Sequence, residues 1–268
     1  MRHVPLDAVL EELFAAEGGS RLRDRLTRAG NRLTKLADAV RLKDIRRNGS
    51  TKWSPLKDRL TAKLGNKCWY TEVELVGAPL SVDHYRPVYD YWWLAYEPAN
   101  YRVACPFANS PKDNEVHGCG GGKGDQFPLL APGQRASSKA DLGMELPVIL
   151  DPCNEVDCEL LAFQSDGRPV LNPAMSHIPN AEERVSRSSF LLNLDHPDFN
   201  SKREQLFHLI ADDVRAYEEL PEGSDSRVTI RTRLAGRIAP EAAFSTAAGY
   251  YLRLYRHLGW VEELLSET

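Results

Sequence analysis

The sequence lacks any long apolar run. No stretch approaches the roughly 18 apolar residues that a membrane-spanning helix needs, and the first residues, MRHVPLDAVLEELF, show no basic-then-apolar signal pattern. Cysteine is also scarce, with 5 in 268 residues, and this odd number does not suggest a disulfide scaffold. We therefore expect a globular protein of the cytoplasm with no membrane partner.

The chain has no overall excess of basic charge, but its charge is unevenly distributed. The net charge is −4, whereas residues 20–63 contain 14 Lys and Arg against 4 Asp and Glu, which leaves −14 on the rest of the chain. Such an asymmetry indicates either a nucleic-acid-binding face or a solvated helix surface balanced by an acidic neighbour. If it is a nucleic-acid face, Arg25, Arg28 and Arg32 are candidate phosphate contacts.

Three regions differ in character. In residues 1–65, apolar residues from Leu22 to Val40 recur at steps of four and three, which predicts one helix face. A second helix is predicted over 56–64, with Ser54 as its cap and Gly65 as its stop. Residues 66–132 are rich in Tyr, Trp, Cys, His, Asn and Gly, and they contain the chemically notable residues. Residues 133–268 begin with short strands, including one predicted at 146–150, and continue as helices.

The strongest local signal is the segment VDHYRP at 82–87. Asp83 and His84 close a predicted strand, where adjacent side chains can diverge toward a metal and toward a water. Asn100 follows His84 by 16 residues, and Asn109 follows it by 25, with a short predicted strand at Tyr101–Ala104 between them. A strand ending in Asp-His, a loop, a second strand and a short helix carrying Asn describe a ββα-metal site.

This order and spacing resemble the HNH nuclease family. The wider pattern is similar to the HNH proteins found with retrons and in the Septu group of anti-phage systems, and the similarity covers roughly residues 53–217. The matching segments are KCWYTE (67–72), VDHYRPV (82–88), YWWLAYEPANYRVAC (91–105), GGKGDQFPL (121–129), ELPVILDP (145–152), LLAFQSDGRP (160–169) and FLLNLDHPDFNSKRE (190–204).

The resemblance implies a role for each residue of the motif. Asp83 and Asn109 would bind one divalent cation, His84 would be the general base, and Asn100 would hold the loop and orient His84. Oxygen ligands suit Mg²⁺ or Mn²⁺, and a histidine is a competent base near neutral pH. The implied protein is α+β, with a central ββα-metal core flanked by N-terminal and C-terminal helices. It would hydrolyse DNA as the effector nuclease of a bacterial anti-phage system, together with an ABC-like ATPase subunit.

Other polar and aromatic residues allow two interpretations. Arg86, Lys112 and Lys123 are candidate phosphate contacts, but each also suits an ordinary surface charge. The aromatic run 91–93 could stack on bases. We favour core packing for it, because the apolar pattern continues to Tyr96.

The cysteine pattern departs from the family. Related proteins usually carry two Cys-x-x-Cys knuckles that hold a structural zinc. Here Cys68 and Cys105 remain, while Thr71 and Ala108 stand where the second cysteines would be. A closed zinc site needs four N or S ligands, so we expect no structural zinc at the knuckles. The alternative is that the glycine-rich segment supplies replacement ligands, His117 and Cys119.

Two rival functions are compatible with the same residues. One is a catalytically decayed HNH fold that binds nucleic acid without cutting it. The other is a subunit that docks on an ATPase through its helical ends.

Overall fold

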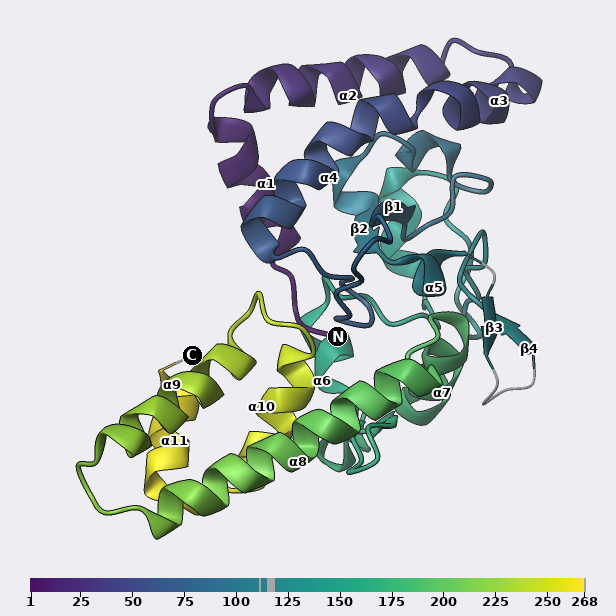
Figure 1. The fold of residues 1–268 in the computed structure, drawn as a ribbon. Coiled ribbons are helices and arrows are strands. Elements are labelled where there is room, and N and C mark those ends of the chain that lie inside the picture. The colour runs from purple at the N-terminus through teal and green to yellow at the C-terminus, as the bar shows by residue number, and fades with distance from the viewer. Residues whose placement is uncertain (111, 115–118, 268) are drawn as a thin grey trace.

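The computed structural model describes residues 1–110, 112–114 and 119–267, with the backbone alone at 112–114 and 119. The protein is α+β: many helices surround three small antiparallel sheets of two strands each in the part of the chain described. The first four helices lie at the top of Figure 1, the sheet β1–β2 lies beneath α4, and the C-terminal helices lie below. One connected cluster of buried residues extends from α1 to α11.

The N-terminal helices are α1 (Leu6–Ala15), α2 (Gly19–Leu33), α3 (Asp38–Asn48) and α4 (Ser50–Leu64). The single helix face predicted from Leu22 to Val40 is wrong, because α2 ends at Leu33 and α3 begins at Asp38. The carbonyl of Leu33 accepts from Arg41 Nε and from the Leu36 N–H, both at 3.0 Å, which stabilises the end of α2. Val40 consequently lies on the surface with 47% of its area exposed.

Helix α4 begins earlier than predicted, and Pro55 lies inside it. It extends from Ser50, so Ser54 is not its cap, and it ends before Gly65, which has the expected positive φ of 92°. Gly49, between α3 and α4, allows a close approach. A Cβ atom there would lie 2.2 Å from the ring of Trp53, so glycine is needed for Trp53 to pack where it does.

The centre of the molecule is a two-stranded sheet followed by a short helix. Strand β1 (Ser81–His84) pairs antiparallel with β2 (Tyr101–Ala104), with Asp83 opposite Arg102. The connection contains two 3₁₀ turns, η1 (Trp92–Leu94) and η2 (Pro98–Asn100). Helix α5 (Pro106–Asn109) follows directly. The strand predicted at Tyr101–Ala104 is confirmed.

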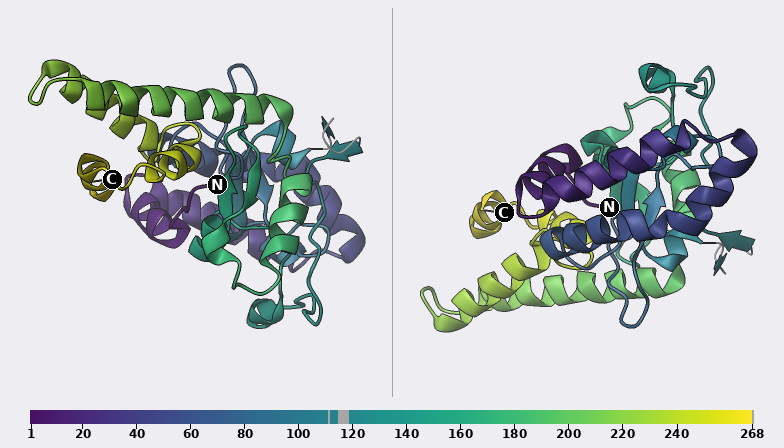
Figure 2. Two further views of the ribbon diagram at one scale, coloured as in Figure 1. Left: turned by 90° about the horizontal axis from the view of Figure 1, so that it is seen from below. Right: turned by 90° about the horizontal axis from the view of Figure 1, so that it is seen from above.

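A hairpin of β3 (Lys112–Asn114) and β4 (Cys119–Gly121) follows α5 and extends from the edge of the molecule in both views of Figure 2. At its base, a Cβ atom on Gly121 would lie 2.1 Å from the side chain of Asn193, so the hairpin can pack here only through glycine. The returning chain continues past α5 to η3 (Lys139–Met144).

The strand predicted at 146–150 is wrong. Among the described residues, this segment forms one isolated bridge, between Leu129 and Pro147. Ile149 and Leu150 are fully buried, and the backbone N–H of Leu150 donates to Ser188 Oγ at 2.9 Å. The apolar run therefore reflects burial in the core rather than pairing in a sheet.

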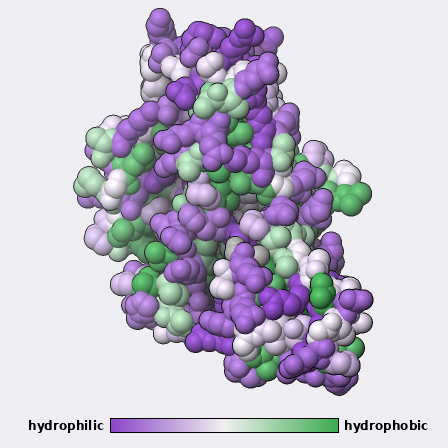
Figure 3. Space-filling model, turned by 90° about the vertical axis from the view of Figure 1, so that its left-hand side faces the viewer, coloured by the Kyte–Doolittle hydropathy of each residue, from purple (hydrophilic) through white to green (hydrophobic). Residues whose placement is uncertain are grey.

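The C-terminal part is mainly helical, as predicted. It contains α6 (Glu155–Glu159), β5 (Leu161–Phe163), β6 (Pro169–Leu171), η4 (Pro173–Met175), α7 (Ala181–Leu191), α8 (Pro197–Glu219), α9 (Asp225–Ile238), α10 (Ser245–Arg253) and α11 (Gly259–Ser266). Within the described ranges, none of the helices is long and apolar enough to cross a membrane. The face in Figure 3 is mostly hydrophilic, with small apolar areas between polar ones.

Candidate active site

The end of β1 and the end of α5 meet at a small cavity of about 180 Å³. Pairing of β1 with β2 fixes the direction of Asp83 and His84, and the short turn from β2 into α5 brings Asn109 beside them. The three motif residues are therefore brought together. The cavity is lined by Val82, Asp83, His84, Pro87, Val88, Asn109, Gly124 and Asp125.

The hydrogen bonds of His84 fix its tautomer. Its Nε2 lies 2.9 Å from the carbonyl oxygen of Ala95, which also accepts from the Tyr101 hydroxyl at 2.9 Å. A carbonyl can only accept, so Nε2 carries the proton and Nδ1 keeps its lone pair. The rings of Trp53 and Tyr101 contact the imidazole edge-on, with centroids at 4.8 Å and 5.2 Å. This burial lowers the pKa of His84 to about 4.

Asp83 is buried, with 3% of its area exposed, and both carboxylate oxygens accept hydrogen bonds. The Tyr70 hydroxyl donates to Oδ2 at 2.6 Å, and the ammonium of Lys123 lies 2.9 Å from Oδ1. Burial, and then the Asp83 charge, raise the pKa of Tyr70. Tyr70 therefore stays a neutral hydrogen-bond donor.

Lys123 occupies an interior position rather than an exposed phosphate-contact position. Its side chain is fully buried, and Nζ also donates to the carbonyl of His84 at 2.7 Å. Its backbone N–H donates to the carbonyl of Ala108 at 2.8 Å, and the next N–H, of Gly124, donates to Asn109 at 3.0 Å. These bonds attach the chain after the hairpin to the end of α5. Both interpretations of Lys123 from the sequence, a phosphate contact and an ordinary surface charge, placed it on the surface, and its full burial corrects them.

The two asparagines have different surroundings. Asn109 Nδ2 donates to Ser81 Oγ at 3.1 Å, and no described residue donates to its amide oxygen. Asn100 binds the backbone of Arg86 twice, accepting from its N–H and donating to its carbonyl, both at 2.9 Å. Asn100 therefore holds the loop after β1. The ring of His84 is oriented by Ala95 instead.

The donor atoms at this cavity suit a hard cation. The carboxylate of Asp83 and the amide of Asn109 are oxygen donors, and Asp125 adds a second carboxylate on the same cavity wall. A carboxylate oxygen that accepts one hydrogen bond keeps a further lone pair. Among the described residues, this cavity included, no three side chains of His, Cys, Asp and Glu gather as a metal site would require, so a cation here would also depend on the amide of Asn109.

Three residues near His84 were missed by the sequence reasoning. Asp125 lies on the cavity wall, Trp53 of α4 packs on the imidazole, and Arg46 of α3 lines an adjoining cavity with His84. The sequence could have suggested Asp125, because this residue lies two positions after Lys123, which was already a candidate. Nothing in the local sequence connects Trp53 or Arg46 to the motif.

The remaining predicted phosphate contacts lie farther from His84 or already have partners. Arg86 Nε lies 2.6 Å from the buried carboxylate of Glu145. Arg25, Arg28 and Arg32 line a separate cavity of about 200 Å³ beneath α2. In that group Arg25 donates to a backbone carbonyl and Arg32 pairs with Asp44, while Arg28 is exposed. The side chain of Lys112 is outside the described part.

The two knuckle cysteines lie side by side in the interior, as predicted. Cys68 and Cys105 are fully buried, and Thr71 Oγ1 lies 3.8 Å from Cys105 Sγ. Burial raises the pKa of Cys68, but hydrogen bonds with Cys105 and Thr71 outweigh this effect and hold it below its ordinary value. The same bond between the thiols, followed by burial, raises the pKa of Cys105. The replacement ligand His117 lies outside the described residues, as does the side chain of Cys119.

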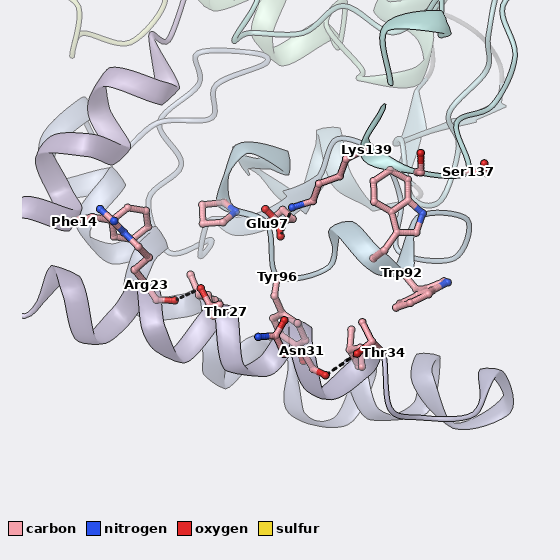
Figure 4. A pocket seen from close by; sticks show the side chains of 16 residues that line it. Phe14, Arg23, Thr27, Asn31, Thr34, Trp92, Tyr96, Glu97, Ser137 and Lys139 are labelled. Carbon is pink, nitrogen blue, oxygen red and sulfur yellow. Dashed lines mark hydrogen bonds and ion pairs between the residues drawn. The ribbon is translucent and has the colours of Figure 1, made fainter. Parts of the chain in front are cut away.

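A larger cavity is at a different place. It has a volume of about 540 Å³ and lies between α2 and the aromatic residues around η1 (Figure 4). Trp92 and Trp93 line it in part, and the guanidinium of Arg41 lies 3.8 Å from the ring centre of Trp92. Tyr91 is fully buried, so its packing in the core is confirmed. This cavity contains no group placed to act as a base, because Glu97 and Lys139 are paired at 2.8 Å.

Compared with known proteins, the chain matches no protein-family model and no curated protein sequence. The family resemblance therefore rests on the motifs themselves and on the arrangement of Asp83, His84 and Asn109.

Proposed function

We propose that this chain is a metal-dependent HNH-type endonuclease that hydrolyses DNA phosphodiester bonds, with His84 as the general base. One observation carries the proposal: the Ala95 carbonyl fixes the proton of His84 on Nε2, Nδ1 has no hydrogen-bond partner among the described residues, and His84 lines a cavity that also has oxygen donors. A fixed, neutral imidazole next to a polar cavity is what proton abstraction from an attacking water requires.

His84 would take the water proton on Nδ1. Burial keeps the imidazole neutral before the reaction, since its pKa is lowered to about 4. Once protonated, the ring keeps its bond to Ala95 and is attracted by Asp83 and Asp125, both of which act to raise the pKa of His84. Trp53 and Tyr101 hold the ring against rotation.

Asp83 and Asn109 would hold one Mg²⁺ or Mn²⁺ ion, and Asp125, which lines the same cavity, would add negative charge to the site. When bound, the cation would stabilise negative charge on the phosphate. Lys123 contributes a permanent positive charge on the other side of Asp83, at 2.9 Å from Oδ1. Its role is to position this carboxylate, and its charge would weaken cation binding compared with an isolated aspartate.

One observation favours a second candidate, a nucleic-acid-binding or ATPase-docking subunit on a decayed HNH fold. Both oxygens of Asp83 are already bonded, to Tyr70 and Lys123, so the carboxylate is neutralised without a metal. The resemblance adds a defence role with an ABC-like ATPase subunit, and co-purification of such a subunit from the native operon would test that extension.

The deciding experiment is cleavage of plasmid and oligonucleotide DNA with Mg²⁺, Mn²⁺ or EDTA, with and without the ATPase. His84→Ala should lose about 10²–10⁴ in rate while keeping its fold. His257→Ala is the matched control, since His257 is exposed and distant in sequence from the motif. Wild-type turnover in His84→Ala would remove His84 from the mechanism, and an inactive wild type that still binds DNA would favour the second candidate.

A further inference from the structure

A second cavity, of about 250 Å³, adjoins the candidate active site. It shares His84, Val88 and Asp125 with the smaller cavity, so the two are continuous around the imidazole. Its volume is below the roughly 300–1,000 Å³ of pockets for drug-sized ligands, and it suits a single ring system. Its lining consists of Leu42, Ile45, Arg46, Ser50, Trp53, His84, Val88, Tyr89 and Asp125.

The cavity has an aromatic wall and an aromatic residue at its mouth. Trp53 forms the wall, and its place beside His84 depends on Gly49, where a Cβ atom would overlap the indole. Tyr89, on the turn after β1, is 61% exposed. In the described structure its hydroxyl has no hydrogen-bond partner. An aromatic side chain held in water beside a catalytic histidine is typical of a residue that stacks on a ligand.

The cavity is lined by one basic and one acidic side chain, Arg46 and Asp125, and no ion pair joins the two. Arg46 lies in the last turn of α3 and is exposed, and no acidic side chain in the described part pairs with it. In contrast, Arg32 pairs with Asp44, and Arg41 pairs with Asp38. Arg46 is therefore free to bind a phosphate that lies within reach of His84.

We propose that this cavity receives one unpaired base of the strand being cut, next to the scissile phosphate, and that the substrate is accordingly single-stranded DNA or an unpaired stretch of a duplex. The inference rests on the proposed nuclease function and adds its substrate class. In a duplex the base is stacked on both faces and paired at its edge, so it can enter only after leaving the helix. Stacking on Tyr89 and Trp53 accepts any base, so the sequence preference is weak.

The test uses His84→Ala protein in EDTA, which separates binding from cleavage. Fluorescence anisotropy compares one labelled oligonucleotide as a single strand and as a duplex. The single strand should bind at least tenfold more tightly. Tyr89→Ala should weaken its binding on the order of tenfold, and Tyr89→Phe should retain it, because stacking needs the ring and not the hydroxyl.

Arg46→Gln and Arg47→Gln form a matched pair, since they remove the same charge from adjacent positions and only Arg46 lines the cavity. Arg46→Gln should weaken single-strand binding more. Equal binding of duplex and single strand, or an unchanged affinity in Tyr89→Ala, would overturn the inference even if the wild type cuts DNA. Conversely, absent cleavage with an intact single-strand preference would count against the nuclease proposal and leave the base-binding cavity supported.

Discussion

Lys123→Met would measure how much the buried ion pair stabilises the candidate site. The substitution keeps a long side chain and removes the ammonium that lies 2.9 Å from Asp83 Oδ1 and donates to the His84 carbonyl at 2.7 Å. Asp83 would then keep the Tyr70 hydroxyl as its remaining side-chain donor. Its carboxylate would stay buried without a compensating charge.

Removing one partner of a buried ion pair costs about 3–5 kcal/mol, because the other charge is left uncompensated. For a chain of this size, each kcal/mol lowers the melting temperature by roughly 2–4 °C, so we expect a decrease of about 6–20 °C. Lys35→Met is the control, since Lys35 is exposed and forms no ion pair within the described ranges. That change should stay within about 0.5 kcal/mol.

The test is a double-mutant cycle, in which thermal and urea unfolding are measured for the wild type, Asp83→Asn, Lys123→Met and the double mutant. Asp83→Asn combined with Lys123→Met should be more stable than Lys123→Met alone, because the unpaired charge is gone. Mn²⁺ should raise the melting temperature of Lys123→Met more than that of the wild type, since a bound cation restores the missing charge. Additive effects of the two substitutions, or a Lys123→Met protein as stable as the wild type, would refute the reasoning.

Three further predictions follow from the same contacts. If His84 is the general base, as proposed, the single-turnover cleavage rate should be flat between about pH 6 and 8 and fall only below about pH 5. The reason is that a base acts in its neutral form and burial lowers the pKa of His84 to about 4. An inflection near 6.5 would mean that the ring is solvated. Elemental analysis after mild chelation should find no stoichiometric zinc at Cys68 and Cys105, and about one zinc per chain would contradict this. Glu72→Gln should destabilise the fold by about 3–5 kcal/mol and reduce the acid sensitivity of unfolding. Burial opposes ionisation of Glu72, but the N-terminal ammonium and Lys67 outweigh burial and hold the pKa of Glu72 below its ordinary value. The ionised carboxylate therefore stabilises the fold fully above an unfolded pKa of about 4.3, and this stabilisation is lost as the pH falls.

The local motif was predictable because its geometry is short-range. Two strands joined by a loop and followed at once by a helix must bring Asp83, His84 and Asn109 close together, whatever surrounds them. The run at 146–150 was not predictable in this way, because an apolar run suits a buried coil as well as a strand. Lys123 looked exposed after a glycine run, and only the backbone bonds from 123 and 124 to α5 show why it points inward.

The surroundings of His84 depend on the tertiary fold and left no signal in the sequence. Trp53 and Arg46 are 31 and 38 residues before His84, and their positions follow from how α3 and α4 pack over β1. The basic charge of residues 20–63 includes Arg46. It could not distinguish Arg46, beside the imidazole, from Arg25 and Arg32, whose charges lie in a separate cavity or are paired.

The loop carrying Cys68 is held by hydrogen bonds to the C-terminal helices, which can stabilise it without a zinc ion. Glu72 adopts a positive φ of 57°, which is uncommon outside glycine, and ends the turn that begins at Cys68. Its backbone carbonyl accepts from Phe244 N–H at 3.1 Å, and its carboxylate accepts from Ser245 Oγ at 2.8 Å. Both donors lie at the start of α10, far from the motif in the sequence.

Lys67 strengthens the same junction. Its ammonium lies 3.0 Å from Glu72 Oε1 and donates to the carbonyl of Ala242 at 2.7 Å. On the core side, the N–H of Trp69 donates to the carbonyl of Val103 in β2 at 2.8 Å. The loop is thus tied to the central sheet and to α10 by buried bonds that need no zinc. Because the bonds from Lys67, Phe244 and Ser245 converge on Glu72, removal of its carboxylate should loosen α10 and the Cys68 loop together.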